Sequence, residues 1–327
     1  MKKLLTLVLV LCLFALPVSA SMAEGQRGGP RGGGNGGMGG MRGGAGTDKS
    51  SDAELQAMIE EVAPKFQLLT FQDPVTGASL SYQLYVPEDY DPAQSYPLIQ
   101  FIPDSSVVGK GADAVLSQGW GGLIWATDAE QAKHPSFVFI PVFTETVVND
   151  SFQHSEQIDT SMRLLKALQE TYSIDSDRIY ATGQSMGGMT AFYESIDYPD
   201  VFAAYFFVGS QWDTGLLQGL EDTPFFYVVA AGDAKASAGL SDLMALFDAD
   251  AVTYAGASWS AQDDAETQKA AVEAMLTEGC TANFMTFTLG STLASGQSSG
   301  GAGEHMTSFD YAYRLEAVRD WLYAQTK

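Results

Sequence analysis

Short apolar stretches alternate with longer amphipathic stretches along most of the chain. Runs of mostly apolar residues, typical of strands buried on both faces, stand at residues 97–103, 137–142, 178–182, 203–208, 225–231 and 283–289. Apolar residues recur every three or four positions, as in helices, at residues 158–172, 187–196, 240–247, 265–276 and 307–325. Ahead of these, residues 52–61 predict a helix, and residues 66–71 and 80–86 predict paired strands. The alternation predicts an α/β fold with helices on both faces of a mostly parallel sheet.

The first twenty residues have the pattern of a signal peptide. Lys2 and Lys3 precede an apolar run at residues 4–16, and the segment ends in the small residues Ser19 and Ala20. An uncleaved membrane anchor is the alternative, but the run is short for a bilayer span. We therefore expect residues 1–20 to be removed and the protein to be secreted, with no stable membrane insertion afterwards.

A glycine-rich stretch follows the signal segment. Glycine at this density cannot recover its backbone entropy by burial, so residues 21–46 predict a disordered linker. Its arginines resemble Arg-Gly repeats that bind RNA, but export and the acidic remainder of the chain argue against that role. Residues 47–327 are left as one catalytic domain.

The net charge and the cysteine content exclude one class of partner and one source of stability. A formal net charge of −23 repels phosphates, so we expect no nucleic-acid partner. Without the signal segment, Cys280 is the only cysteine, which excludes an internal disulfide and makes a hydrophobic core the source of stability. The residues predict no cofactor and no metal.

The sequence Gly183-Gln184-Ser185-Met186-Gly187 matches the nucleophile pattern G-x-S-x-G. It follows a predicted strand and opens a predicted helix, the context in which a serine sits exposed on a sharp turn. The same pattern recurs at residues 296–300, within a Gly/Ser-rich stretch without apolar periodicity. Context therefore favours Ser185 as the nucleophile.

A serine hydroxyl needs a base to accept its proton. In enzymes with this kind of turn the order along the chain is serine, acid, histidine, and of the three histidines (His134, His154 and His305) only His305 follows Ser185. We expect His305 to be the base, in a loop before the last helix.

The acid has two candidates. Asp233 follows the apolar strand at residues 225–231, and Asp213 follows the preceding strand. The position of Asp233 at the end of a central strand favours it as the supporting acid.

An oxyanion hole requires two backbone N–H groups aimed at the developing negative charge. Met186, directly after the nucleophile, is one expected donor. The second should come from the turn after the strand at residues 97–103, where Pro103 has no N–H, so Asp104 or Ser105 is expected.

The serine motif with Gly188, the turn at residues 232–236, and His305 ahead of residues 311–313 and 320–322 together resemble one family. They are similar to secreted esterases of the polyhydroxybutyrate-depolymerase and feruloyl-esterase group, which are prolyl-oligopeptidase-like serine hydrolases. The resemblance implies an α/β-hydrolase fold and an esterase with a Ser-His-Asp triad, carried here by Ser185, His305 and Asp233. Two departures are Pro103-Asp104, where many members have His-Gly, and Lys235, where the acid often stands.

The sequence thus predicts a serine esterase that acts on a small-molecule or polymer-linked ester. A related serine peptidase and a non-catalytic binding module on the same fold are the alternatives.

Overall fold

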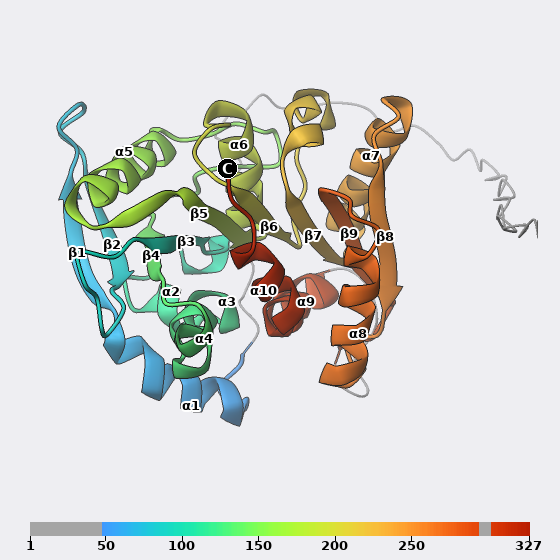
Figure 1. Cartoon of the computed structure of the whole chain (residues 1–327), viewed down its shortest axis with the longest axis horizontal. Coiled ribbons are helices and arrows are strands. Elements are labelled where there is room, and N and C mark those ends of the chain that lie inside the picture. The colour runs from blue at the N-terminus through green and yellow to red at the C-terminus, as the bar shows by residue number, and fades with distance from the viewer. Residues whose placement is uncertain (1–47, 294–301) are drawn as a thin grey trace, which may run out of the picture. The chain divides into compact units, whose positions relative to one another are not determined.

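The computed structural model describes residues 48–293 and 302–327. The predicted signal peptide and linker lie outside these residues. The described part contains a nine-stranded sheet in the order β1-β2-β4-β3-β5-β6-β7-β9-β8 (Figure 1). β1 and β2 form an antiparallel hairpin, β2 pairs antiparallel with β4, and every other neighbouring pair is parallel. The fold class is therefore α/β with a mostly parallel sheet, as the sequence predicts.

Most strands are short, and the strands in the centre of the sheet are wholly buried apart from the first half of β5. Their bounds are β1 Gln67–Gln72, β2 Ser79–Tyr85, β3 Tyr96–Ile102, β4 Phe137–Val142, β5 Ile174–Gln184, β6 Ala204–Val208, β7 Phe225–Ala230, β8 Tyr254–Trp259 and β9 Ala282–Phe287. All residues of β3, β4, β6 and β7 are buried. Burial on both faces explains why these strands read as continuous apolar runs.

The described residues contain ten α-helices. They are α1 Ala53–Val62, α2 Ala114–Ser117, α3 Trp120–Leu123, α4 Asp128–Lys133, α5 Glu156–Thr171, α6 Met186–Asp197, α7 Ala234–Ala249, α8 Ala265–Leu276, α9 Ala302–Arg314 and α10 Glu316–Tyr323. Several begin at a side chain that accepts a backbone N–H, as at Asp52, Ser155 and Asp264. Such caps satisfy donors that the first helical turn leaves free.

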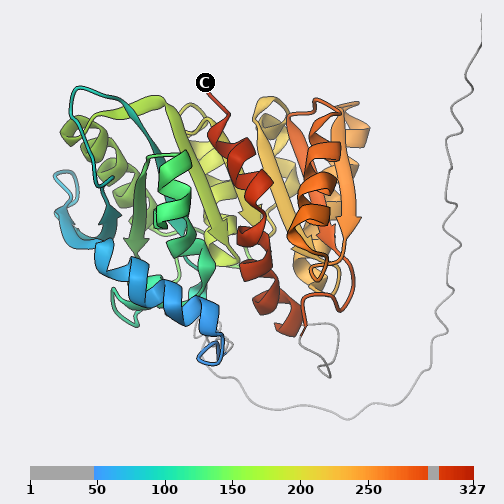
Figure 2. The same ribbon diagram turned by 60° about the horizontal axis from the view of Figure 1, so that its bottom comes forward.

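Two hydrophobic clusters fill the two faces of the sheet. Helices α5, α6 and α7 pack on one face, while α1, α3, α8, α9 and α10 pack on the other, which comes forward in Figure 2. Alternation along β7 sends Phe226 and Val228 into one cluster and Phe225 and Tyr227 into the other.

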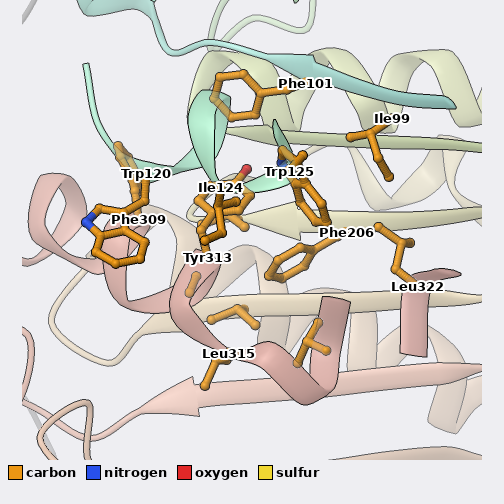
Figure 3. Packing of buried hydrophobic residues seen from close by; sticks show 14 of the residues in the cluster. Ile99, Phe101, Trp120, Ile124, Trp125, Phe206, Phe309, Tyr313, Leu315 and Leu322 are labelled. Atoms are coloured by element: carbon orange, nitrogen blue, oxygen red, sulfur yellow. The ribbon is translucent and has the colours of Figure 1, made fainter. Parts of the chain in front are cut away.

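Aromatic rings form the centre of the face that α9 and α10 cover (Figure 3). Tyr313 makes edge contacts with Phe101, Trp125 and Phe206 at centroid distances of 5.7, 6.3 and 5.4 Å. This packing fixes α9 against the sheet, and α9 carries His305.

Two predictions about the C-terminal part were wrong. The single helix expected at residues 307–325 is two helices separated by Leu315, whose backbone is not helical (φ −68°, ψ 87°). His305 was expected in a loop, but α9 begins at Ala302, so His305 lies in its first turn.

The edge strand β8 was not predicted, because Gly256 and the partly exposed residues around it break the apolar run. No helix in the described residues is long and apolar enough for a membrane span.

Candidate active site

Ser185 sits at a sharp turn between β5 and α6. Its backbone has φ 52° and ψ −117°, a conformation that non-glycine residues rarely adopt. The turn is held by the Ser185 N–H, which donates to the carbonyl oxygen of Val208 at 3.0 Å. Ser185 stays partly exposed at this turn.

The glycines of the motif allow the strand and the helix to approach. A Cβ atom on Gly183 would lie 2.4 Å from the backbone of Gly187, and one on Gly188 would lie 2.4 Å from the Ser210 hydroxyl. Neither distance leaves room for a methyl group, so the turn requires glycine at both positions.

His305 connects Ser185 to Asp233. The Ser185 hydroxyl and His305 Nε2 are 2.8 Å apart, and His305 Nδ1 makes a close contact with Asp233 Oδ2. The edge of the imidazole ring packs on Phe309, with ring centroids 4.9 Å apart. The structure therefore brings together the three residues that the sequence nominates, from the ends of β5 and β7 and the start of α9.

Asp233 is held rigidly. Only 4% of the residue is exposed, and its Oδ1 accepts the N–H of Ala236 at 3.2 Å, which caps α7. One carboxylate oxygen thus orients the helix and the other contacts His305. A Cβ atom on Gly232 would lie 1.8 Å from Glu304 Oε1, so a side chain at this position would displace the carboxylate of Glu304.

The other candidates lie outside this arrangement. Asp213 is exposed, and its carboxylate accepts the N–H of Gly215 at 3.0 Å. His154 stacks on Tyr193, and His134 bonds to Asp320. The second G-x-S-x-G pattern lies outside the described residues.

Asp104 and Ser105, in the turn after β3, are the two candidates for the second oxyanion donor, and only one of them has a free backbone N–H. The Asp104 N–H donates to Gln118 Oε1 at 3.3 Å, whereas no acceptor in the described residues takes the N–H of Ser105 or Met186. Helix α6 begins at Met186, which leaves that amide free as a first-turn donor. Ser105 therefore fits a second oxyanion donor better than Asp104 does.

Buried polar side chains hold this turn in place. Asp104 accepts the N–H of Ser106 at 2.7 Å and the side-chain amide of Gln184 at 2.7 Å. Gln184 also donates to Gln118 Oε1 at 2.8 Å. The sequence indicated neither glutamine as a site residue, although Gln184 is the residue before Ser185. Gln118, whose side chain contacts both Asp104 and Gln184, comes from a segment with no recognisable motif.

A buried acid lies further along α6. Glu194 is completely buried, which raises the pKa of its carboxyl to about 8, although donation from Gln100 opposes the shift. Gln100 Nε2 lies 2.7 and 2.9 Å from the two oxygens of Glu194, and Gln100 Oε1 has no partner in the described residues.

The arrangement can move one proton. With Nδ1–H donated to Asp233, His305 Nε2 carries a lone pair and can accept the Ser185 proton, while Asp233 stabilises the imidazolium that forms. The free amides of Ser105 and Met186 can bind a negatively charged oxygen.

Comparisons with known proteins support the fold. No family model and no curated protein matches the chain. The crystal structure of a thermostable esterase superposes with a TM-score of 0.60 and 23% identity over 82% of this chain and 64% of that one. This chain thus spans less than two thirds of the esterase's length.

More distant structural matches are also esterases or hydrolases. A ferulic acid esterase has a TM-score of 0.49 and 12% identity, covering 78% of this chain and 98% of its own. An S-formylglutathione hydrolase from Staphylococcus aureus has a TM-score of 0.43 and 13% identity, covering 79% and 98%. The likeness to the thermostable esterase and the strand order show the α/β-hydrolase fold.

Proposed function

We propose that this chain is a serine esterase that hydrolyses carboxylic esters through an acyl-enzyme intermediate. The observation that carries the proposal is the position of His305, in hydrogen-bond reach of both Ser185 and Asp233. Three side chains from separate elements converge where the fold presents the carboxyl ends of its parallel strands, which is where such sheets hold their sites.

The first half of the reaction forms the acyl-enzyme. Ser185 Oγ attacks the ester carbonyl carbon while its proton passes to His305 Nε2, and the carbonyl oxygen becomes negatively charged. The N–H groups of Ser105 and Met186 stabilise that charge. The alcohol then leaves, taking the proton from His305, and the acyl group remains on Ser185.

The second half returns the free enzyme. His305 takes a proton from a water molecule, whose oxygen attacks the acyl carbon. Collapse of this intermediate releases the acid and returns a proton to Ser185. Asp233 keeps its charge throughout and fixes the imidazole in the tautomer that accepts at Nε2.

Esters are proposed ahead of peptides because of the resemblance described above to secreted esterases. The likeness to a thermostable esterase agrees with this choice. A peptidase on the same fold is the second candidate within serine hydrolases. A non-catalytic binding module is disfavoured by the complete set of Ser185, His305 and Asp233.

A fluorophosphonate probe tests the proposal. The purified chain should be labelled at Ser185 and should hydrolyse members of a p-nitrophenyl ester panel of graded acyl length faster than a dipeptide p-nitroanilide. Ser185→Ala should abolish labelling and lower kcat by several orders of magnitude. Ser298→Ala, in the second copy of the pattern, is the matched control and should change neither. Labelling that survives in Ser185→Ala would refute the assignment of Ser185 as the nucleophile.

We also propose that the enzyme acts outside the cytoplasm, after removal of residues 1–20. Support comes from the charged, apolar and small-residue segments at the N-terminus. N-terminal sequencing of protein recovered from the culture medium should begin at Ser21. Full-length chain retained with the cells would contradict this.

A further inference from the structure

Three side chains that suit a metal ion meet at the amino end of the sheet. Glu130 lies on α4, His134 is the residue at which that helix ends, and Asp320 lies on α10. One ligand atom from each lies within 4.8 Å of those of the other two. β4 starts shortly after His134 and runs parallel to β3 and β5, whose carboxyl ends lie at the candidate active site. The group therefore lies at the amino ends of these strands, opposite Ser185.

Glu130 supplies the observation that points to a cation. The residue is only 3% exposed, and its Oε2 accepts from Arg319 Nε at 3.0 Å. Its Oε1 is also buried, yet no donor in the described residues reaches it. A buried carboxylate oxygen is costly to leave without a donor or a cation, and such atoms are rare in folded proteins.

His134 and Asp320 complete the group from the solvent side. His134 Nε2 lies 2.9 Å from Asp320 Oδ1, and the imidazole stacks on Tyr323 with ring centroids 4.4 Å apart. The side chains of His134 and Asp320 are 25% and 41% exposed. An ion can therefore enter from water, while the stacked ring fixes the direction of the nitrogen.

The donor set selects the kind of ion. One imidazole nitrogen and two carboxylate oxygens suit Zn²⁺, which binds such ligands at about 2.0–2.2 Å, and they suit Mg²⁺ or Ca²⁺ less, because those ions prefer oxygen. We propose that Glu130, His134 and Asp320 bind one Zn²⁺, with water in the remaining position. The inference does not depend on the proposed esterase function.

The neighbouring charges permit a divalent ion. Two carboxylates face the site, and Arg319 compensates only part of their charge. Lys133 Nζ lies 3.9 Å from Asp320 Oδ1 but also pairs with Glu316. Asp320 can therefore turn toward the ion while Lys133 keeps a carboxylate partner.

Zinc at this position would join α4 to α10. These helices are far apart in the sequence, and the second lies at the C-terminal end of the chain. An ion that binds the folded state and not the unfolded state raises the melting temperature with its concentration. The proposed role is structural, since the group lies away from Ser185.

Zinc titration tests the inference on the chain purified with a chelator and then dialysed. Isothermal titration with ZnCl₂ should show one site per chain, and the melting temperature should rise by several degrees at saturation. His134→Ala and Asp320→Asn should each weaken binding at least tenfold and remove the thermal shift. MgCl₂ should produce no comparable shift.

His154→Ala is the matched control, because His154 also stacks on a tyrosine but belongs to no such group among the residues that the structure describes. It should bind Zn²⁺ as the unmodified chain does. A wild-type chain without a zinc-dependent shift, or His134→Ala with an undiminished one, would overturn the proposal. If His134→Ala does not fold by circular dichroism, Asp320→Asn, at a partly exposed position, decides the question.

Discussion

A Cβ atom on Gly187 would lie 1.9 Å from the carbonyl oxygen of Ile102. Gly187 lies in the first turn of α6, two residues after Ser185. Ile102 is the last residue of β3, and the turn that follows this strand carries Ser105. Contact between the two backbones therefore sets the distance between the candidate nucleophile and the candidate oxyanion donor. A side chain at Gly187 would separate these two parts of the site.

Gly187→Ala should damage both stability and activity. The atoms that a new methyl group would meet belong to the backbone of Ile102 and Pro103, which cannot rotate away. We expect a loss of about 3 kcal/mol or more in the free energy of unfolding, together with a large loss of kcat. Gly219→Ala is the control, since nothing lies within 4 Å of its added Cβ. Differential scanning fluorimetry that shows equal melting temperatures for the two variants would contradict this reasoning.

Asp233→Asn should reduce kcat strongly, by about 10³- to 10⁴-fold, because an amide favours the wrong tautomer of His305 and cannot stabilise the imidazolium. Asp213→Asn should stay within a few-fold of the wild type, since Asp213 is exposed and caps a short turn. Steady-state kinetics on one soluble ester distinguishes them. If Asp213→Asn were the crippled variant, the acid would belong to the earlier strand.

The contrast between Asp233 and Asp213 shows what a sequence can predict. Both follow apolar strands, and strand position alone favoured Asp233. The residues Ser185, Asp233 and His305 could be named because each stands at the end of a strand or near a helix start that apolar periodicity marks. Their mutual geometry depends on the packing of α9, which periodicity placed too late in the chain.

Other features had no local pattern to indicate them. Gln118 reaches Asp104 and Gln184 from a short helical segment, and a glutamine there has no signature of its own. The cluster of Glu130, His134 and Asp320 joins residues from distant parts of the chain, so only the fold shows that they are neighbours. Long-range proximity of ordinary polar residues is the information that spacing does not contain.

Gln118→Ala should lower kcat by roughly 10- to 100-fold, less than the loss expected for removing an oxyanion donor outright. The side chain accepts the N–H of Asp104 and the amide of Gln184, and so positions the turn that presents Ser105. KM should change little, because Gln118 acts through this turn. Ser117→Ala is the control, as its exposed hydroxyl bonds only to backbone oxygens of its own helix. A raised KM with unchanged kcat would instead make Gln118 a substrate-binding residue.

Glu194 should make the stability of the protein depend on pH. Burial raises the pKa of its carboxyl from 4.5 to about 8 in the folded state. The folded state therefore holds a proton that the unfolded state releases above pH 4.5. The stability associated with the protonated acid is complete below that value, decreases as the pH rises, and is lost once the pH passes about 8.

Glu194→Gln removes this dependence because an amide of the same shape carries no charge at any of these pH values. We expect the variant to have the same melting temperature as the wild type near pH 5. Above pH 8 the variant should melt at a higher temperature, because the wild type then carries a buried charge that costs a few kcal/mol of stability. Glu170→Gln, at an exposed position on α5, is the control and should follow the wild type throughout. Melting temperatures measured from pH 5 to pH 9 give the comparison. Parallel curves for the wild type and Glu194→Gln would mean that the carboxyl at Glu194 is ionised in the folded protein at neutral pH, with Gln100 as a sufficient partner.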